Sequence, residues 1–346
     1  MTKEQWETLV RVTQGKWQGP APVGFIIDSP WLPGWADMDR MDYFTSERCW
    51  LDANLKAIEA FPEVLFLPGF WSEYAMATEP SAFGAKCVWP EGDLPFAEQV
   101  IDSMDEMARI KKPNPRRDGL LPFVIKRLQQ TEGRINEAGH GIYFAVARGP
   151  MNIAAFLMGT TEFLTALRML PDEVHGLLDT ITSFLEEWLQ YQKECFPTID
   201  GILLLDDIVG FTGEEDFREF SQPYLRRAFH AFDATVRFFH NDAEGVATAQ
   251  HCEEIGINLF NFSFQHSIAE MQRLTHGNVA LLGNIPPRDV LAVGGPEEVR
   301  EAIRASLEGV EDTSRVVLSC GGGMPPGVPT ENIRAVLEAR DSLAAK

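Results

Sequence analysis

The stretch Thr235–Asp242, TVRFFHND, ends an apolar run with two side chains that can do chemistry. His240 and Asp242 are separated by one residue, so the period-two geometry of a β-strand sends both side chains to the same side. An imidazole and a carboxylate placed together can share a metal ion or act as a general acid/base pair. An aspartate at this point can instead cap a following helix. The spacing leaves these three alternatives open.

Other short apolar runs also end in polar side chains. Asp206 and Asp207 close one run as a carboxylate pair, and in either register one of the two faces the same side as alternate residues of the run. The remaining polar run ends are Asp28, Asn261, Asn284 and Cys320. Cys320 can be a thiolate ligand or a buried small residue, and Asn284 can bind a ligand or tie down the turn that follows it.

These residues lie at the ends of six of eight apolar runs, and segments with helical period separate most of the runs. Strands that are buried on both faces and alternate with helices predict a parallel sheet closed as a single (β/α)₈ TIM barrel. In that architecture the chemistry lies at the C-terminal ends of the strands, which is where the polar residues stand. The runs are Val23–Asp28, Val64–Gly69, Gly141–Gly149, Gly201–Asp207, Thr235–Asp242, Ile257–Ser263, Val279–Asn284 and Arg315–Gly323.

The segment from Phe70 to Arg117 is irregular and rich in Pro, Gly and Trp. It predicts a long insertion after the second strand, with a helix over Phe96–Lys111, and we expect Phe70–Pro95 to close over the barrel mouth. One barrel with an N-terminal helical extension accounts for residues 1–346 as a single domain.

Composition excludes several classes of partner. The formal net charge of −21 argues against a nucleic acid, because phosphate binding needs a basic surface. No apolar run is long enough to predict a membrane span, and no signal-peptide pattern begins the chain. The five scattered cysteines are typical of reduced thiols, so we expect a cytoplasmic enzyme of small molecules, with a homodimer as a compatible assembly.

Several longer stretches occur in an order that resembles a known family. From about Gly141 to the C-terminus the chain is similar to the uroporphyrinogen decarboxylase superfamily. This superfamily includes the uroporphyrinogen decarboxylases and corrinoid-dependent methyltransferases such as the methylcobalamin:coenzyme M enzymes, and the resemblance implies the same barrel. The stretches are Gly149–Gly159, Leu204–Arg227, Phe238–Gly245, Glu253–Phe262, Leu281–Leu291 and Gly321–Ala339, with a looser match over Thr78–Phe96.

The resemblance to the decarboxylases is incomplete. Their Arg-Gln-Ala-Gly-Arg motif after the first strand is absent, Phe156 stands at their substrate-binding tyrosine, and Gly322 stands at their C-terminal histidine. Asp206 or Asp207 keeps their aspartate position. Because a porphyrinogen with eight carboxylates needs several guanidinium partners, these departures argue against that substrate.

The resemblance to the methyltransferases implies a zinc site. Their His-x-Cys at the fifth strand appears here as His240 and Asp242, and their later cysteine falls on Gly322, with Cys320 two residues earlier. Zinc accepts nitrogen, oxygen and sulfur ligands, so we expect His240, Asp242 and Cys320 to bind it. The fourth ligand is expected to be Glu79, or Glu73 in the same loop.

The resulting expectation is a zinc-assisted methyltransferase. It would move a methyl group between a small compound, methoxylated or methylamine-like, and a separate corrinoid protein. Two alternatives stay open: a cofactor-free decarboxylase of a porphyrinogen or smaller acid, and a non-catalytic corrinoid- or tetrapyrrole-binding protein. The expected catalytic residues are Asp206, Asp207, His240 and Asn284, and the expected substrate-binding residues are Asp28, Trp31, Trp71, Phe156 and Asn261.

Overall fold

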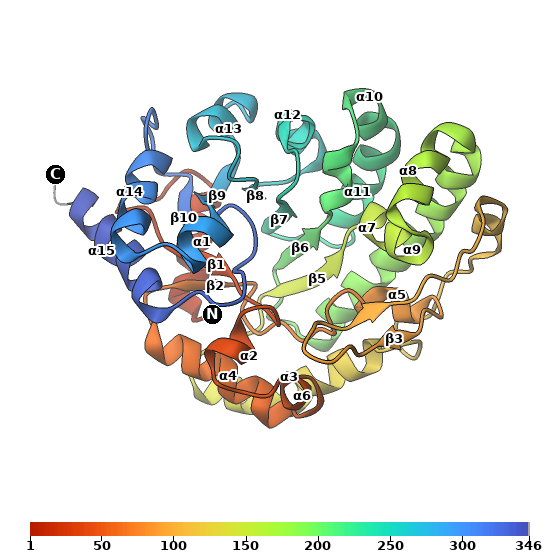
Figure 1. Ribbon diagram of the computed structural model, residues 1–346, viewed down its shortest axis with the longest axis horizontal. Helices are drawn as coiled ribbons and strands as arrows, with labels where there is room; N and C mark the ends of the chain where they lie inside the picture. Colours follow the sequence, from red (N-terminus) through yellow and green to blue (C-terminus); the bar gives the residue numbers. More distant parts are fainter. Residues whose placement is uncertain (345–346) are drawn as a thin grey trace.

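Parallel strands surround the centre of the computed structural model, which describes residues 1–344 of the chain (Figure 1). Within these residues each of the eight apolar runs forms a strand, as predicted. The strands are β1 (Gly24–Ile26), β2 (Leu65–Leu67), β5 (Phe144–Arg148), β6 (Gly201–Leu205), β7 (Val236–Asn241), β8 (Leu259–Phe262), β9 (Ala280–Ile285) and β10 (Val316–Cys320).

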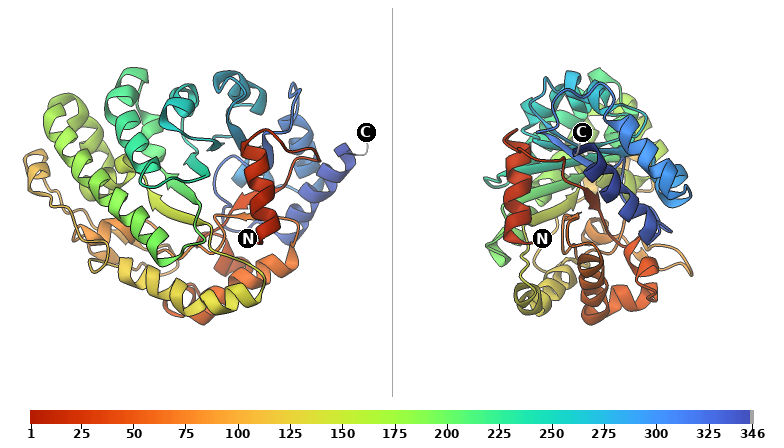
Figure 2. Two further views of the ribbon diagram at one scale, coloured as in Figure 1. Left: turned by 180° about the vertical axis from the view of Figure 1, so that it is seen from behind. Right: turned by 90° about the vertical axis from the view of Figure 1, so that its left-hand side faces the viewer.

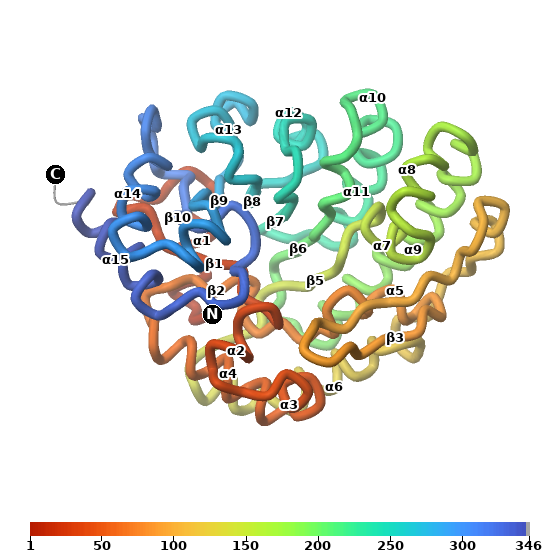
Figure 3. The backbone as a smooth tube through the Cα atoms, viewed as in Figure 1, coloured from red at the N-terminus to blue at the C-terminus, as the bar shows by residue number. Residues whose placement is uncertain are grey.

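The strands pair in parallel as a barrel with one weak seam. Six of them form a sheet in the order β10-β9-β8-β7-β6-β5, and β1 pairs with β2. A parallel bridge between Val23 and Leu318 joins β1 to β10. In the described part of the chain no ladder joins β2 to β5, and the long insertion leaves the barrel at this point (Figure 3).

Helices cover the outside of the barrel (Figures 1 and 2). None of those described is both long and apolar enough to cross a membrane. The helices that follow the first two strands are α2 (Leu32–Trp35), α3 (Arg40–Thr45), α4 (Glu47–Ala60), α5 (Thr78–Ala82) and α6 (Leu121–Glu137). The later helices are α7 (Pro150–Met158), α8 (Thr160–Met169), α9 (Pro171–Cys195), α10 (Glu214–Asp216), α11 (Gln222–Phe229), α12 (Val246–Ile255), α13 (Ile268–Leu274), α14 (Pro296–Ser306) and α15 (Thr330–Ala344).

The predicted N-terminal helical extension is α1 (Lys3–Thr13), which covers one end of the barrel (Figure 2). Its buried face, with Trp6, Leu9 and Val12, packs in the same apolar cluster as the inward side chains Phe144 and Phe238. Burial of these side chains removes apolar surface from water and fills the barrel interior. The opposite end, where the strands finish, is left for polar side chains.

The insertion after β2 differs from the prediction in one part. Phe96 begins a short strand, β4 (Phe96–Ala97), which pairs antiparallel with β3 (Cys87–Val88), and only a 3₁₀ turn follows at Met104–Arg109. The predicted helix over Phe96–Lys111 is therefore wrong. Cross-strand pairing with Cys87–Val88 overrides the local helical pattern, since the segment has few buried side chains with which to pack a helix.

Candidate functional site

β7 positions the central residue of the site. Val236 and Phe238 point into the barrel core, and the alternation of a strand places His240 on the same inner face, at the C-terminal end. Only 6% of His240 is exposed. The imidazole therefore forms the floor of the barrel mouth above the apolar interior.

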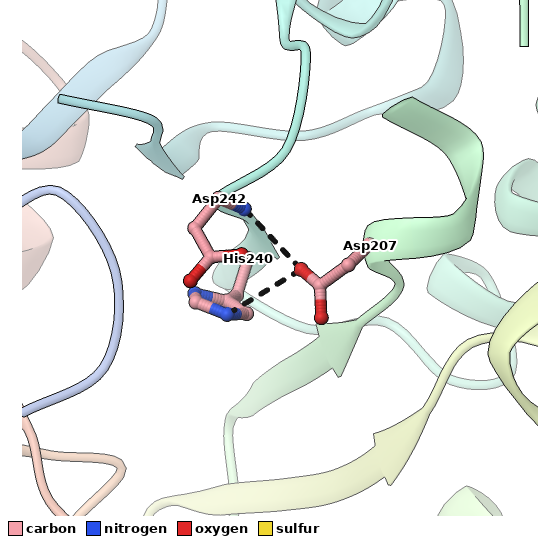
Figure 4. A group of neighbouring side chains, drawn as sticks. All are labelled: Asp207, His240 and Asp242. Atoms are coloured by element: carbon pink, nitrogen blue, oxygen red, sulfur yellow. Dashed lines mark hydrogen bonds and ion pairs between the residues drawn. The ribbon is translucent and has the colours of Figure 1, made fainter. Parts of the chain in front are cut away.

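Three side chains meet at this floor: Asp207, His240 and Asp242 (Figure 4). One ligand atom from each lies within 4.8 Å of those of the other two. His240 Nε2 is 3.5 Å from Asp207 Oδ1, and the Asp242 backbone N–H donates to the same oxygen at 3.2 Å. Because Asp207 is 37% exposed at its side chain and Asp242 is exposed, the group is reached from solvent through its carboxylates.

Asn261 determines which nitrogen of His240 carries a proton. Its Nδ2 donates to the backbone carbonyls of Leu282 at 2.8 Å and Cys320 at 3.1 Å, which fixes the orientation of the amide. Its Oδ1 must then accept from His240 Nδ1, 2.7 Å away. In the neutral imidazole the lone pair is consequently on Nε2, which faces Asp207 and is free to bind a metal.

The charges of the group act on one another. Burial lowers the pKa of His240, but the carboxylates of Asp207 and Asp242 outweigh it, so that the pKa is raised above its usual value. The pKa of Asp207 is also raised, by burial first and then by the Asp242 carboxylate, against the opposing effect of His240. Two carboxylates around one imidazole therefore favour a positive charge at the centre of the site.

Asp206 and Asp207 are separated by the turn at the end of β6. The buried Asp206 carboxylate accepts from the backbone N–H groups of Met151 and Asn152, each at 2.9 Å, and so caps the N-terminus of α7. Burial raises the pKa of Asp206, and these two N–H groups act in the opposite direction. Of the two predicted catalytic aspartates, only Asp207 belongs to the site.

Asp242 does not cap a helix. α12 begins at Val246 with Gly245 before it, so the cap alternative for Asp242 is excluded. Gly322 lies directly beside this carboxylate: a Cβ at position 322 would be 2.9 Å from Asp242 Oδ2, and the backbone φ of +139° favours glycine. The missing side chain leaves the exposed side of Asp242 uncrowded.

The donors of this group fit zinc. One imidazole nitrogen and two carboxylates are ordinary zinc ligands, and three protein ligands with one free position are typical of catalytic zinc sites. The predicted ligand set needs correction, however. Cys320 points away into the outer apolar core, where its thiol contacts the Gly322 carbonyl, and burial raises its pKa to about 12. Glu79 pairs with Arg148 instead, and Asp207 is the third member of the group beside His240 and Asp242.

The other half of the mouth contains a second buried charge cluster. Arg148 ends β5 with 8% exposure; its Nη1 is 3.7 Å from Glu79 Oε2, and its guanidinium lies over the Trp71 ring at 5.6 Å. Glu73 is buried nearby. Arg148 is not among the residues predicted from the sequence, although it is the last inward-facing residue of the run Gly141–Gly149 and so resembles the other polar run ends.

Asp28 lies between the two halves. Burial and the Glu73 charge raise its pKa to about 8, while Arg148 and His240 partly oppose that shift. The charges of Glu73, Arg148 and His240 thus all act on Asp28, which places it within electrostatic reach of both clusters. Asp28 is therefore protonated in a substantial fraction of molecules at neutral pH.

The remaining predicted residues are divided between the site and the core. Trp71 lies at the mouth, where its ring contacts the Arg148 guanidinium. Trp31, in contrast, is fully buried, stacks on Trp35 and donates to the Val328 carbonyl. The prediction of Trp31 as a substrate contact is therefore wrong, because no face of the ring is available. Phe156 is half-buried on α7.

Asn284 lies on the inner face of β9 at the same end of the barrel as His240, as predicted. Its amide, however, donates to the His266 carbonyl, so it ties down the loop after β8. The insertion forms its own cavity of about 430 Å³ beside the mouth, between α2 and α3 and the loop of Trp89. His240 is not among the residues lining that cavity.

Comparison with known proteins places this geometry in a family. The uroporphyrinogen decarboxylase (URO-D) family model matches residues 38–343. The chain belongs to the uroporphyrinogen decarboxylase family. A uroporphyrinogen decarboxylase of Anaeromyxobacter sp. (strain Fw109-5) is 26% identical over 261 residues, covering 73% of this chain and 72% of that protein. One of Chloroherpeton thalassium (strain ATCC 35110 / GB-78) is 27% identical over 271 residues, covering 75% and 74%.

The family fold extends to a methyltransferase. The solved structure of a methyltransferase from Methanosarcina mazei superposes with a TM-score of 0.81 at 17% identity, covering 98% of both chains. The superposition confirms the predicted TIM barrel, and the family model confirms the predicted superfamily. At 17% identity this likeness shows the fold alone. The reaction must therefore be inferred from the residues of the site.

Proposed function

We propose that this chain is a zinc-dependent methyltransferase that moves a methyl group between a small compound and a corrinoid carried by a separate protein. The observation that carries the proposal is the Asp207–His240–Asp242 group, with its ligand atoms within 4.8 Å of one another at the C-terminal end of the barrel. When bound, zinc would lower the pKa of an oxygen or sulfur nucleophile of the substrate.

The residues of the chain would support this chemistry by positioning. Asn261 holds His240 with Nε2 free, and the Asp242 backbone N–H orients the Asp207 carboxylate toward the same point. Carboxylates are harder ligands than thiolates. A site with two carboxylates therefore favours a substrate that binds the metal through oxygen.

A porphyrinogen fits the mouth less well. Among the described residues the buried arginines are Arg127 and Arg148. Arg127 is already bonded to the Phe44 carbonyl and the Tyr74 hydroxyl, which leaves Arg148 as the guanidinium with unused donors. One such arginine is too few for eight carboxylates. Decarboxylation remains the second candidate, favoured by the names of the curated relatives.

Metal analysis of protein purified without chelator tests the proposal. We expect about one zinc per chain, lost in His240→Ala, because removal of one of three ligands abolishes a catalytic zinc site. His251→Ala is the matched control: His251 also lies between two carboxylates, those of Glu214 and Glu254, but on the outer helix α12. This variant should keep the zinc.

Two activity assays separate the candidate functions. With a methylated corrinoid as methyl donor and a hydroxyl or thiol compound as acceptor, we expect the wild-type protein to cause loss of the methyl–cobalt absorbance. The His240→Ala variant should cause no such loss. Uroporphyrinogen should not be decarboxylated. A protein without zinc that produces coproporphyrinogen would establish the second candidate and overturn the first.

A further inference from the structure

Two buried carboxylates in the β1–β2–β5 half of the mouth each have an oxygen without a hydrogen-bond donor. Glu73 and Glu79 are both 2% exposed. Glu73 Oε1 and Glu79 Oε2 accept no hydrogen bond within the described residues, although the other oxygen of Glu73 accepts from Ala75 N–H. A buried acceptor without a donor is costly, so these oxygens are positioned for a group that the chain does not supply.

Arg148 lies beside Glu79 and offers hydrogen-bond donors where the two glutamates offer acceptors. Its Nη1 lies 3.7 Å from Glu79 Oε2, which is an ion-pair distance but too long for a hydrogen bond. Among residues 1–344 its guanidinium donates no side-chain hydrogen bond, and the face of Trp71 holds it in place. Donors without an acceptor in the described part of the chain therefore lie beside the buried Glu79 carboxylate, at a side chain that is itself only 10% exposed.

The combination selects a ligand by charge. A simple anion would be attracted by Arg148 but repelled by Glu73 and Glu79, and a simple cation would be attracted by the two carboxylates but would leave the donors of Arg148 unused. A ligand that carries both an ammonium and a carboxylate satisfies all three residues at once. Its carboxylate would accept from Arg148 while its ammonium donates to Glu79 and Glu73.

We propose that Arg148, Glu79 and Glu73 bind the head group of an amino-acid-like zwitterion, and that such a compound is the small substrate of this enzyme. That the compound is a substrate rests on the proposed function, and the head-group site adds the chemical class of that substrate. The charges of both Arg148 and His240 act on Asp28, so Asp28 would lie between the head-group site and the Asp207–His240–Asp242 group. The reactive end of the substrate would extend across Asp28 toward His240.

Isothermal titration calorimetry with the common amino acids and sarcosine tests the head-group site directly. At least one of them should bind the wild-type protein, and acetate and methylamine, which carry one half of the head group each, should bind at least about tenfold more weakly. Acetate binding as tightly as the best amino acid would reveal a plain anion site and overturn the inference. Failure of every amino acid to bind would overturn it as well.

Substitutions assign the binding to the named residues. Arg148→Gln and Glu79→Gln should each weaken the binding of the best amino acid by about tenfold or more, because each removes a charge-assisted hydrogen bond. Glu79→Gln is the deciding variant if Arg148→Gln does not give a native near-ultraviolet circular dichroism spectrum. Unchanged affinity in Glu79→Gln would overturn the inference.

The matched control is Asp242→Asn, which should lose zinc but keep the amino-acid affinity within about twofold, since Asp242 belongs to the other half. Zinc binding without amino-acid binding would overturn this inference and leave the proposed function standing. Amino-acid binding by a protein that never holds zinc would overturn the proposed function and leave the head-group site standing.

Discussion

The two halves of the barrel mouth use charged residues in opposite ways. On the β6–β7–β8 side, Asp207, His240 and Asp242 are held by hydrogen bonds and open toward solvent. On the β1–β2–β5 side, Glu73, Glu79 and Arg148 are almost fully buried, and each of the two carboxylates keeps a buried oxygen that accepts no hydrogen bond from the described residues. This difference is what the two proposals expect: a metal site whose residues are already positioned in the first half, and a polar ligand that pairs with the buried charges in the second.

The largest contrast should appear in stability. Arg148→Met removes the charge partner of a buried carboxylate, so the free energy of unfolding should fall by about 3 to 5 kcal/mol. Asp242→Asn changes an exposed side chain and should alter it by no more than about 0.5 kcal/mol. Urea unfolding of both variants measures this, and equal losses would contradict the division into two halves.

A second contrast separates adjacent aspartates. Asp206→Ala leaves the buried backbone N–H groups of Met151 and Asn152 without an acceptor and should cost about 2 to 3 kcal/mol, with zinc retained. Asp207→Ala should cost less than about 1 kcal/mol and lose the zinc. Thermal unfolding with metal analysis of each variant checks the pair. Zinc loss in both would show that Asp206 also serves the site.

Asn261 orients the imidazole of His240 in the first half through a hydrogen bond to its Nδ1. Asn261→Ala frees the His240 ring to rotate and removes the acceptor that holds its Nδ1 proton, so zinc affinity should fall by about 10- to 100-fold. A chelator competition titration measures the change. Retention of full affinity would mean that packing alone orients the imidazole.

The protonation of Asp28 depends on charges from both halves, so it provides a test of their electrostatic coupling. Its folded-state pKa of about 8 lies above the ordinary value of 3.8, so the folded protein keeps a proton that the unfolded chain releases. Stability should therefore decrease as the pH rises from about 4 to about 8, by about 1 to 2 kcal/mol after allowance for partial exposure. Asp28→Asn should flatten this dependence in urea unfolding at pH 5, 6.5 and 8. An unchanged slope would show that Asp28 does not carry the proton.

Sequence patterns determined the barrel, its eight strands and the end of the barrel at which the polar residues collect. Periodicity suffices for this, because strands buried on both faces are apolar throughout and any polar residue at their ends stands out. The spacing of His240 and Asp242 likewise follows from the alternation of a strand, and the structure keeps both on one side.

Only the tertiary structure decided which polar residues belong together. Asp206 and Asp207 are neighbours in sequence, yet the turn after β6 sends one to the α7 N-terminus and the other to His240. Cys320 ends its strand facing outward, and the 3.7 Å approach of Arg148 to Glu79 joins β5 to a loop that follows β2. Such pairings depend on the register and on loops that cross between strands, where long-range packing outweighs any local signal in the chain.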